Sequence, residues 1–407
     1  MGTSWKSASV HCGSDSWIDS LPSTPAFVFD KDRINANLAR FKQIRSISGC
    51  HVLYSIKACP AEALLREIAN QVDGFSVSSL FEARLANEVT NGTAKLHTTT
   101  PGFRREEMSE LGTLCETVSF NSLNQLQRLP FLIAGRANIG LRVNPQLSFL
   151  EDRRYDPCCH YSKLGAPLSE VVESWSNGSL LRSGLSGLHL HTNFGATSFA
   201  PLESTVNHLE AQLPELMKQI DWINLGGGYL FQKANDLDRL LATLQQIRDG
   251  WQAEVYLEPG SSIVDDAGML VTTVIDRFES DGKSIAVLDT SVNHLPEVFE
   301  YQTKPRLHGE NQQAPVAMTL VGSTCLSGDL FGDYRFDRPL QINDRIMFHQ
   351  VGAYSLVKAS RFNGLNLPSL CYLQGNRLTH VRRYHYEEYR QQWCEDDSEQ
   401  QRQRVGL

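Results

Sequence analysis

The lysine most able to do chemistry in this chain follows a short apolar run. Lys57 comes directly after HVLYSI, where a charged ammonium is costly to bury unless it is paired or covalently bound. A desolvated lysine has a lowered pKa and can attack a carbonyl carbon to form a Schiff base. The alternative is an ordinary lysine that extends into solvent just beyond a strand, and position alone does not separate the two.

Two histidines lie two residues apart. His189 and His191 belong to GLHLH, so on a strand both side chains point to the same face. They could bind a metal or contact a flat ligand. Zinc needs a third protein ligand, for which the sequence offers no matching cluster, so we expect no metal. We expect His191 to contact the ligand, while a structural role fits His189 better.

Three glycines and a glutamate complete the set. Gly226, Gly227 and Gly228 follow WINL, and successive glycines let backbone N–H groups approach a phosphate. Glu258, within EPG, needs a cationic or N–H partner if it is buried. An aldehyde for the lysine, a phosphate for the glycines, a protonated ring nitrogen for the glutamate and a flat face for a histidine all occur in pyridoxal 5′-phosphate. The sequence therefore predicts this cofactor.

These residues need elements that bring them together. Eight short apolar runs alternate with helical segments in the first two thirds of the chain, which is typical of a (β/α)8 TIM barrel. In such a barrel the carboxyl ends of all strands share one face, and the residues above follow those ends. The eight runs are 51–58, 74–79, 96–100, 116–122, 138–145, 187–193, 222–229 and 254–260.

After residue 260 the pattern changes to strand-like runs joined by turn-rich loops. We expect a barrel domain over 31–261 and a C-terminal all-β domain formed by 1–30 and 262–407. The run at 26–30 could join the β domain or lead into the first helix, and we expect the polar tail from Glu387 to fray. The strand-like runs are 270–278, 284–290, 316–325 and 345–354.

Composition excludes several classes of protein. The 407 residues include 38 Lys and Arg and 46 Asp and Glu, so the formal charge of −8 offers no basic surface for nucleic acid. We expect no membrane segment and no signal peptide, because no stretch approaches 18 consecutive apolar residues and the N-terminus lacks the signal pattern. Nine cysteines without a C-x-x-C pair fit a reduced compartment, so we expect a cytoplasmic protein.

Longer motifs resemble a known family. The fold-type III decarboxylases, which include ornithine and diaminopimelate decarboxylases, have motifs similar to YSIKA, GLHLH, NLGGGY, EPG and TCLSGD in this order. Carboxynorspermidine (carboxyspermidine) decarboxylases are more similar still, in YDPCCHYSKLG, LDTSVNHLPEVFEY, STCLSGDLFGDYRFDRPL and AYSLVKASRFNGLNLPS. The resemblance covers about 25–389 and implies an alanine-racemase-like fold and removal of the α-carboxylate from a carboxylated polyamine in spermidine biosynthesis.

The resemblance also implies roles for single residues. Lys57 would bind the cofactor covalently, His191 would stack on its ring, and Glu258 would keep the ring nitrogen protonated. Cys325, an acid for the product carbon, and Asp329 would come from the neighbouring subunit of a head-to-tail homodimer. The phosphate would be held by Gly226, Gly227, Gly228 and Tyr354. The substrate would be contacted by Arg142, Ser261, Asp289, Glu297 and Asp329.

The chain departs from this family pattern near the expected substrate. Ser261 replaces a second glutamate that usually follows EPG, and Glu297 stands where an Asp is usual. Asn193 and Phe194 replace a Cys-Glu pair. Fewer carboxylates would select a long polycation less strongly, so an intermediate of siderophore or other specialised metabolism is the alternative substrate. The alternative functions are an amino-acid racemase, a metal-dependent hydrolase and a non-enzymatic cofactor carrier.

Overall fold

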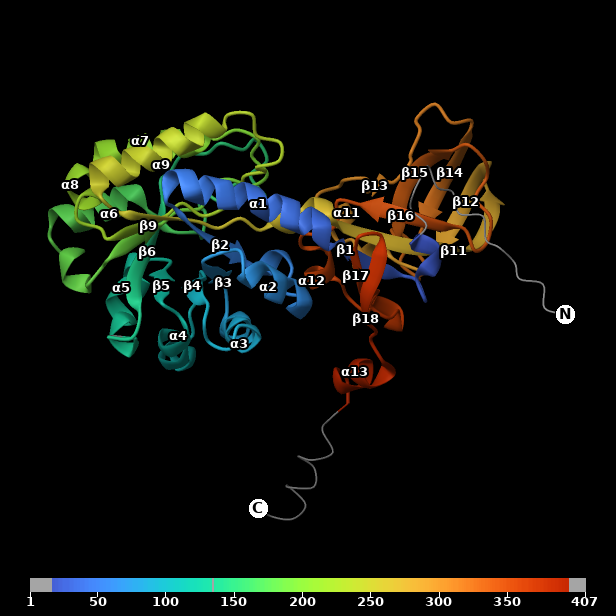
Figure 1. Ribbon diagram of the computed structural model, residues 1–407, viewed down its shortest axis with the longest axis horizontal. Coiled ribbons are helices and arrows are strands. Elements are labelled where there is room, and N and C mark those ends of the chain that lie inside the picture. Colours follow the sequence, from blue (N-terminus) through green and yellow to red (C-terminus); the bar gives the residue numbers. More distant parts are fainter. Residues whose placement is uncertain (1–16, 134, 395–407) are drawn as a thin grey trace, which may run out of the picture. The chain divides into compact units, whose positions relative to one another are not determined.

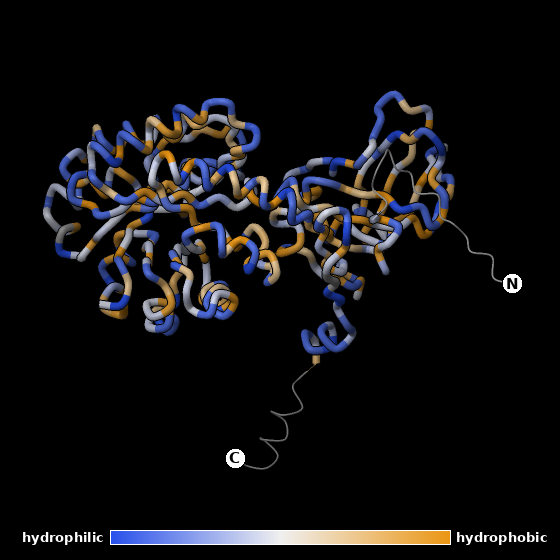
Figure 2. Tube along the Cα trace, viewed as in Figure 1, coloured by the Kyte–Doolittle hydropathy of each residue, from blue (hydrophilic) through white to orange (hydrophobic). Residues whose placement is uncertain are grey.

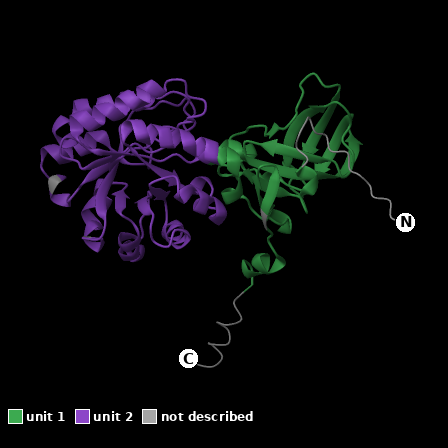
Figure 3. Cartoon of the chain, in the orientation of Figure 1, with its two compact units in different colours: residues 1–34, 264–407 green, residues 35–263 purple. Residues whose placement is uncertain are grey.

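The structure is a computed structural model that describes residues 17–133 and 135–394. The chain divides into two compact units, shown in different colours in Figure 3. The barrel unit is Asn35–Ile263, and the β unit combines Met1–Ile34 with Val264–Leu407. The first long helix begins at Lys31, so we keep 31–261 as the proposed limits of the barrel domain.

The barrel unit contains a closed sheet of eight parallel strands (Figure 1). The strands follow the order β5–β4–β3–β2–β10–β9–β8–β6, and pairing of β5 with β6 closes the ring. The predicted barrel is confirmed. Its strands are β2 (His51–Ser55), β3 (Gly74–Val77), β4 (Lys95–Thr99), β5 (Thr117–Phe120), β6 (Asn138–Asn144), β8 (Gly187–His189), β9 (Trp222–Asn224) and β10 (Glu254–Leu257), with the short β7 (Ala166–Pro167) beside β6.

Amphipathic helices surround these strands. In α9 the buried side chains of Leu240, Leu244, Ile247 and Trp251 recur every three or four residues, and Figure 2 shows the matching alternation of hydropathy. No helix in the described ranges is long and apolar enough to cross a membrane. The helices are α1 (Lys31–Ser48), α2 (Glu62–Ala69), α3 (Leu80–Val89), α4 (Met108–Leu114), α5 (Leu123–Arg128), α6 (Leu168–Ser176), α7 (Ala200–Gln212), α8 (Pro214–Met217), α9 (Leu237–Trp251) and α10 (Ser261–Val264).

A tryptophan fills space that glycines leave on neighbouring strands. Trp222 in β9 lies opposite Gly187 in β8, which in turn lies opposite Gly140 in β6. A Cβ atom would lie 2.2 Å from the indole at Gly187 and 2.5 Å from it at Gly140. The indole is almost fully buried, so two strands lose side chains to admit one large ring.

This packing predicts the effect of a single methyl group. Gly187→Ala should overpack the barrel and lower the free energy of unfolding by about 1–3 kcal/mol, followed as a lower midpoint of urea unfolding. Gly102→Ala is the matched control, because a Cβ atom there meets nothing within 4 Å. Equal midpoints for the two variants would show that the indole does not constrain Gly187.

The β unit is built on a nine-stranded, mostly antiparallel sheet, which confirms the predicted all-β region. The run at 26–30 does both things considered above, because β1 pairs with β11 and β17 and then leads directly into α1. The strands are β1 (Ala26–Asp30), β11 (Gly268–Ser280), β12 (Lys283–Leu288), β13 (Arg306–Leu307), β14 (Val316–Val321), β15 (Leu330–Phe336), β16 (Arg345–His349), β17 (Ser369–Gln374) and β18 (Arg377–Arg382).

Two expectations for this unit were wrong, and two strands were missed. The turn-rich stretch after Ser327 contains β15, which pairs with β14 along its whole length. The strands β17 and β18 lie beyond the last predicted strand. The tail forms α13 (Tyr386–Gln391), whose capping box explains why a polar segment is helical, while residues 395–407 lie outside the described part.

The β unit also contains two short helices, α11 (Glu297–Glu300) and α12 (Ser355–Lys358).

Candidate active site

A cavity of about 280 Å³ opens at the carboxyl ends of the barrel strands. This is the end at which barrel enzymes place their active sites. Five charged or imidazole side chains from four strands or strand ends meet there, and four of the five were predicted as site residues. These five are Lys57, Arg142, His189, His191 and Glu258. The other lining residues are Ser78, Thr99, Pro101, Arg154, Tyr155, Asp156, Pro157, Leu164 and Phe194.

Lys57 lies in a single helical turn, Ile56–Ala58, directly after β2. Burial lowers the pKa of Lys57, and Arg142 adds to this shift, whereas the carboxylate of Glu258 opposes it. A lower pKa provides more of the neutral amine, which is the form that attacks a carbonyl carbon.

Glu258 is a carboxylate with 5 % of its surface exposed, held by two side chains. Asn224 Nδ2 donates to Oε1 at 2.7 Å, and His189 Nε2 lies 3.4 Å from Oε2. Burial alone would raise the pKa of Glu258, but His189, Lys57 and Asn224 together lower it well below the usual range. The structure therefore presents an ionised carboxylate inside the cavity. His189 thus contacts a side chain, Glu258, and its structural role stays a prediction.

His191 follows the end of β8 and is oriented by the backbone. The N–H of Gly227 donates to His191 Nδ1 at 3.3 Å. Burial lowers the pKa of His191 well below its usual value, and the positive charges of Lys57 and Arg142 lower it further. The ring is therefore neutral, with its proton on Nε2. A neutral flat ring suits contact with the face of an aromatic ligand.

The glycine triplet allows close backbone approach. Gly226 and Gly228 have φ angles of 68° and 90°, and a Cβ atom on any of the three residues would lie within 2.2 Å of a carbonyl oxygen. The N–H groups of Gly226 and Gly227 already donate to Asn224 Oδ1 and His191 Nδ1. The triplet thus positions the side chains around it, and its contact with phosphate stays a prediction.

Arg142 extends from β6 into the cavity with 8 % of its surface exposed. Burial lowers its pKa to about 10, so the guanidinium remains charged at neutral pH. Among residues 17–133 and 135–394 no hydrogen bond or ion pair engages this group. A buried unpaired cation is costly, which favours an anionic group of a ligand as its partner.

Ser261, Cys325 and Tyr354 are not among the residues that line this cavity. Ser261 begins α10 after the EPG segment and does not line the cavity. In the β unit, Cys325 is exposed, and its N–H donates to Asn363 Oδ1 at 2.8 Å. Tyr354 has a φ of 69°, a strained backbone conformation for a tyrosine and one that functional sites often hold. Their roles stay predictions.

The three acids predicted to contact substrate from the β unit are bonded within that unit. Asp289 accepts hydrogen bonds from the hydroxyls of Thr24 and Thr272 and from the Thr273 N–H. Asp329 accepts from the N–H groups of Val292 and Thr324 and from the Thr324 hydroxyl. Glu297 accepts from the Ser355 hydroxyl at 2.7 Å. These bonds show that Asp289 and Asp329 connect strands and turns.

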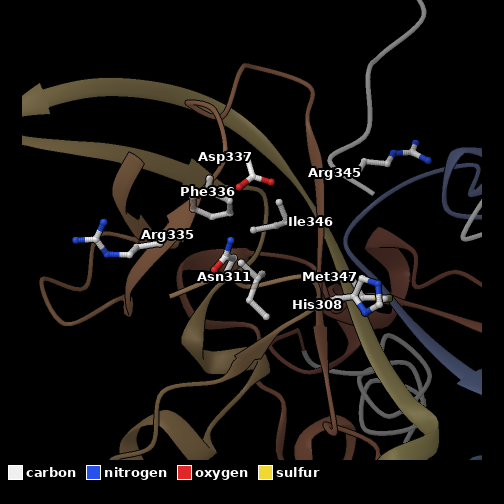
Figure 4. A pocket seen from close by; sticks show the side chains of 10 residues that line it. His308, Asn311, Arg335, Phe336, Asp337, Arg345, Ile346 and Met347 are labelled. Atoms are coloured by element: carbon white, nitrogen blue, oxygen red, sulfur yellow. The ribbon is translucent and has the colours of Figure 1, made fainter. Parts of the chain in front are cut away.

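Two other hollows are poorer candidates. In the β unit, a cavity of about 30 Å³ between β13, β15 and β16 has the volume of one water molecule (Figure 4). At the amino ends of the barrel strands, a hollow of about 420 Å³ lies over Trp222, Glu254 and Tyr256. Barrel enzymes place their active sites at the opposite end of the barrel. Among the described residues that line this hollow there is no buried lysine that could react with a carbonyl group.

The segments after β6 and β8 supply lining residues that were not among the predicted site residues. Arg154, Tyr155 and Asp156 line the cavity, and Phe194 faces Tyr155 with the ring centroids 5.6 Å apart. Asn224 was also missed. Asn224 is the last residue of β9, and Lys57 and Glu258 likewise follow the ends of β2 and β10. A polar residue at the end of a barrel strand was therefore the signal that could have identified Asn224.

Comparison with known proteins identifies the family. Residues 27–352 match the family described as pyridoxal-dependent decarboxylase, C-terminal sheet domain. Carboxyaminopropylagmatine decarboxylase of Synechocystis sp. is 32% identical over 92% of this chain and 96% of its own. Carboxynorspermidine/carboxyspermidine decarboxylase of Campylobacter jejuni is 30% identical over 90% of this chain and 97% of its own.

Solved structures agree with this assignment. The structure of carboxynorspermidine decarboxylase from Campylobacter jejuni, complexed with norspermidine, has a TM-score of 0.82 and 29% identity over 91% of this chain and 100% of that one. Diaminopimelate decarboxylase from Helicobacter pylori, complexed with L-lysine, has a TM-score of 0.80 at 20% identity over 92% of this chain and 98% of that one, which shows the fold alone.

The residues in the cavity fit pyridoxal 5′-phosphate. The amine of Lys57 suits its aldehyde, the ionised Glu258 suits a protonated ring nitrogen, and the neutral ring of His191 suits its flat face. The cationic Arg142 suits an anionic oxygen. Family match, fold and donor set agree: this chain is an enzyme of the pyridoxal-dependent decarboxylase family, a lyase that uses pyridoxal 5′-phosphate.

Proposed function

We propose that the enzyme removes the α-carboxylate of a carboxylated polyamine, either carboxynorspermidine or carboxyspermidine. Full-length similarity to decarboxylases bearing these names supports the substrate. The ionised Glu258 in the cavity of Lys57 supports the reaction type. We place the reaction in the cytoplasm, because the eight cysteines of the described part are all free.

Each cavity residue has a separate task in this reaction. Pyridoxal 5′-phosphate, when bound, accepts the electron pair that remains on Cα after carbon dioxide leaves. Lys57 would hold the cofactor through its aldehyde carbon, with the aldehyde oxygen leaving as water. Glu258 would hold a proton at the ring nitrogen, and His189 and Asn224 contact the Glu258 carboxylate. Arg142 would bind an anionic oxygen of the ligand, and His191 would contact the flat face of the ring.

The charge of Glu258 is the part of this mechanism that a single substitution isolates. Glu258→Gln keeps the shape and the bond from Asn224 but removes the negative charge. We expect kcat to fall by at least about 100-fold, since a neutral amide does not keep the ring nitrogen protonated. Asp249→Asn, on the exposed surface of α9, is the control. Steady-state kinetics with both enzymes saturated with cofactor would give the answer, and a kcat near wild type contradicts the role.

We further propose a head-to-tail homodimer in which Cys325 of the neighbouring subunit completes each site. The exposed thiol of Cys325, on a turn fixed by Asn363, supports this arrangement. The family resemblance supports it as well. The thiol would donate the proton that Cα needs after carbon dioxide has left.

Mixing two inactive variants tests the shared site. Lys57→Ala should have no activity and no absorption from covalently bound cofactor, and Cys325→Ala should be strongly impaired. After unfolding and joint refolding in equal amounts, half of the dimers carry both variants, each with one intact site. We expect about a quarter of wild-type activity, by the statistics of a closed twofold assembly. No recovery, with dimers present by size-exclusion chromatography, counts against sharing.

The choice of substrate is a matter of direct comparison. Carboxyaminopropylagmatine is the second candidate, because the relative of that name is 32% identical over nearly the whole chain. We expect the highest kcat/KM for carbon dioxide release from carboxynorspermidine or carboxyspermidine, with carboxyaminopropylagmatine next and meso-diaminopimelate and L-ornithine at least about 100-fold lower. A preference for either amino acid, or racemisation without carbon dioxide, would reject the proposal.

A further inference from the structure

The cavity holds a second carboxylate that the mechanism does not use. Among the described residues that line it, Glu258 and Asp156 carry carboxylates, whereas Lys57, Arg142 and Arg154 carry positive charge. Glu258 is already held by Asn224 and His189. Asp156 is therefore the acid that remains for a cationic group of the substrate.

The bonds of Asp156 leave part of its acceptor capacity free. The N–H of Cys158 donates to Oδ1 at 2.8 Å, and the hydroxyl of Ser148 donates to Oδ2. Each carboxylate oxygen can accept about two hydrogen bonds, so one site on each oxygen remains. Asp156 is 5 % exposed, and no ion pair joins it to a Lys, Arg or His in the described ranges. A buried charge in this state is stabilised by a cation.

Aromatic rings beside Asp156 define the kind of cation. Tyr155 and Phe194 also line the cavity, and their rings are stacked with an interplanar angle of 23°. The Arg154 guanidinium lies 5.2 Å from the centroid of the Tyr155 ring, so this pair already attracts a cation through a ring quadrupole. The apolar edges of the two rings suit the methylene groups of an alkyl chain. A carboxylate next to such a surface matches an alkylammonium chain, in which apolar and charged groups alternate.

We propose that Asp156 binds the distal ammonium of the substrate, with the alkyl chain of that arm along Tyr155 and Phe194. The proposal rests on the polyamine substrate proposed above. Asp156 then sets the preference for a long cationic arm and does not take part in the removal of carbon dioxide. A substitution of Asp156 should therefore change KM and the affinity for product, whereas a substitution of Glu258 should change kcat.

Three enzymes test this role in their cofactor-loaded form: wild type, Asp156→Asn and Ser148→Ala. Asp156→Asn keeps an acceptor for the Cys158 N–H but loses the charge. Ser148→Ala removes the loop hydrogen bond and keeps the charge. Norspermidine binding is measured by calorimetry, and kcat and KM are measured with carboxynorspermidine. Asp156→Asn should raise Kd and KM by at least about tenfold with kcat within about threefold, and Ser148→Ala should change each value by less than about threefold.

A substrate without the distal aminopropyl arm, 2,4-diaminobutyrate, isolates the interaction. Wild type and Asp156→Asn should then have equal kcat/KM. Equal norspermidine affinity in both enzymes overturns the role of Asp156 and leaves the proposed function standing. Equal losses in Asp156→Asn and Ser148→Ala also overturn it, because loop order then accounts for the effect. If wild type neither binds norspermidine nor acts on carboxynorspermidine, the proposed function itself fails. If Asp156→Asn does not fold, Asp156→Glu is measured in its place. It keeps the negative charge and should bind norspermidine more tightly than Asp156→Asn would.

Discussion

The arrangement of the site depends on keeping one negative charge buried. Burial raises the pKa of Glu258, and His189, Lys57 and Asn224 together lower it well below the usual range. Asn224 is held in turn, because its Oδ1 accepts from the N–H of Gly226 while the carbonyl of Gly226 accepts from the N–H of Glu258. The ends of β9 and β10 thus form one hydrogen-bonded circuit. Loss of any one of these side chains would leave a buried polar group without a hydrogen-bond partner. That costs more free energy than replacing both partners with apolar groups.

This circuit gives two of the three glycines, Gly226 and Gly227, a structural role that does not depend on phosphate. When the circuit is formed, Gly226 lies close to the carbonyl oxygen of Leu190 and Gly227 lies close to that of Glu258. A Cβ atom on either glycine would be 2.2 Å from that oxygen, so neither position can carry a side chain. The second of these approaches also lets the Gly227 N–H reach His191 and orient its ring. Gly226 and Gly227 therefore allow neighbouring barrel strands to share a hydrogen-bonded network at their ends, while Gly228 approaches the carbonyl of Asn193.

The sequence predicted what depends on local pattern. Runs of apolar residues mark the barrel strands, and Lys57, His191 and Glu258 could be expected in one place because they lie on or just after such runs, whereas Arg142 was expected only from the family resemblance. β15 was missed because GDY and flanking polar residues resemble turns, and only its pairing with β14 makes them a strand. Pairing of distant segments leaves no local trace in a half-exposed strand.

The acids show the other limit of sequence reasoning. Asp289 and Asp329 each accept three hydrogen bonds from threonine hydroxyls and backbone N–H groups, and their contact with substrate stays a prediction. Asp156 was passed over within the YDPC segment, although it lines the cavity and accepts only two. The residue type alone does not distinguish these acids, whereas the number of acceptor positions that remain on each does.

The acceptor positions that remain on Asp156 give the cavity a place for positive charge as well as for negative charge. Lys57 and Arg142 come from β2 and β6 at the barrel mouth, where the aldehyde and anionic oxygens of the ligand belong, and Asp156 follows from the segment after β6. The cofactor aldehyde suits Lys57 and an anionic oxygen suits Arg142, so a substrate that also satisfies Asp156 must carry a cationic group. An amino acid with a cationic side arm has this distribution, whereas a neutral or purely anionic substrate would leave Asp156 buried without a cation. The unused carboxylate therefore selects among decarboxylase substrates that the reacting end alone cannot distinguish.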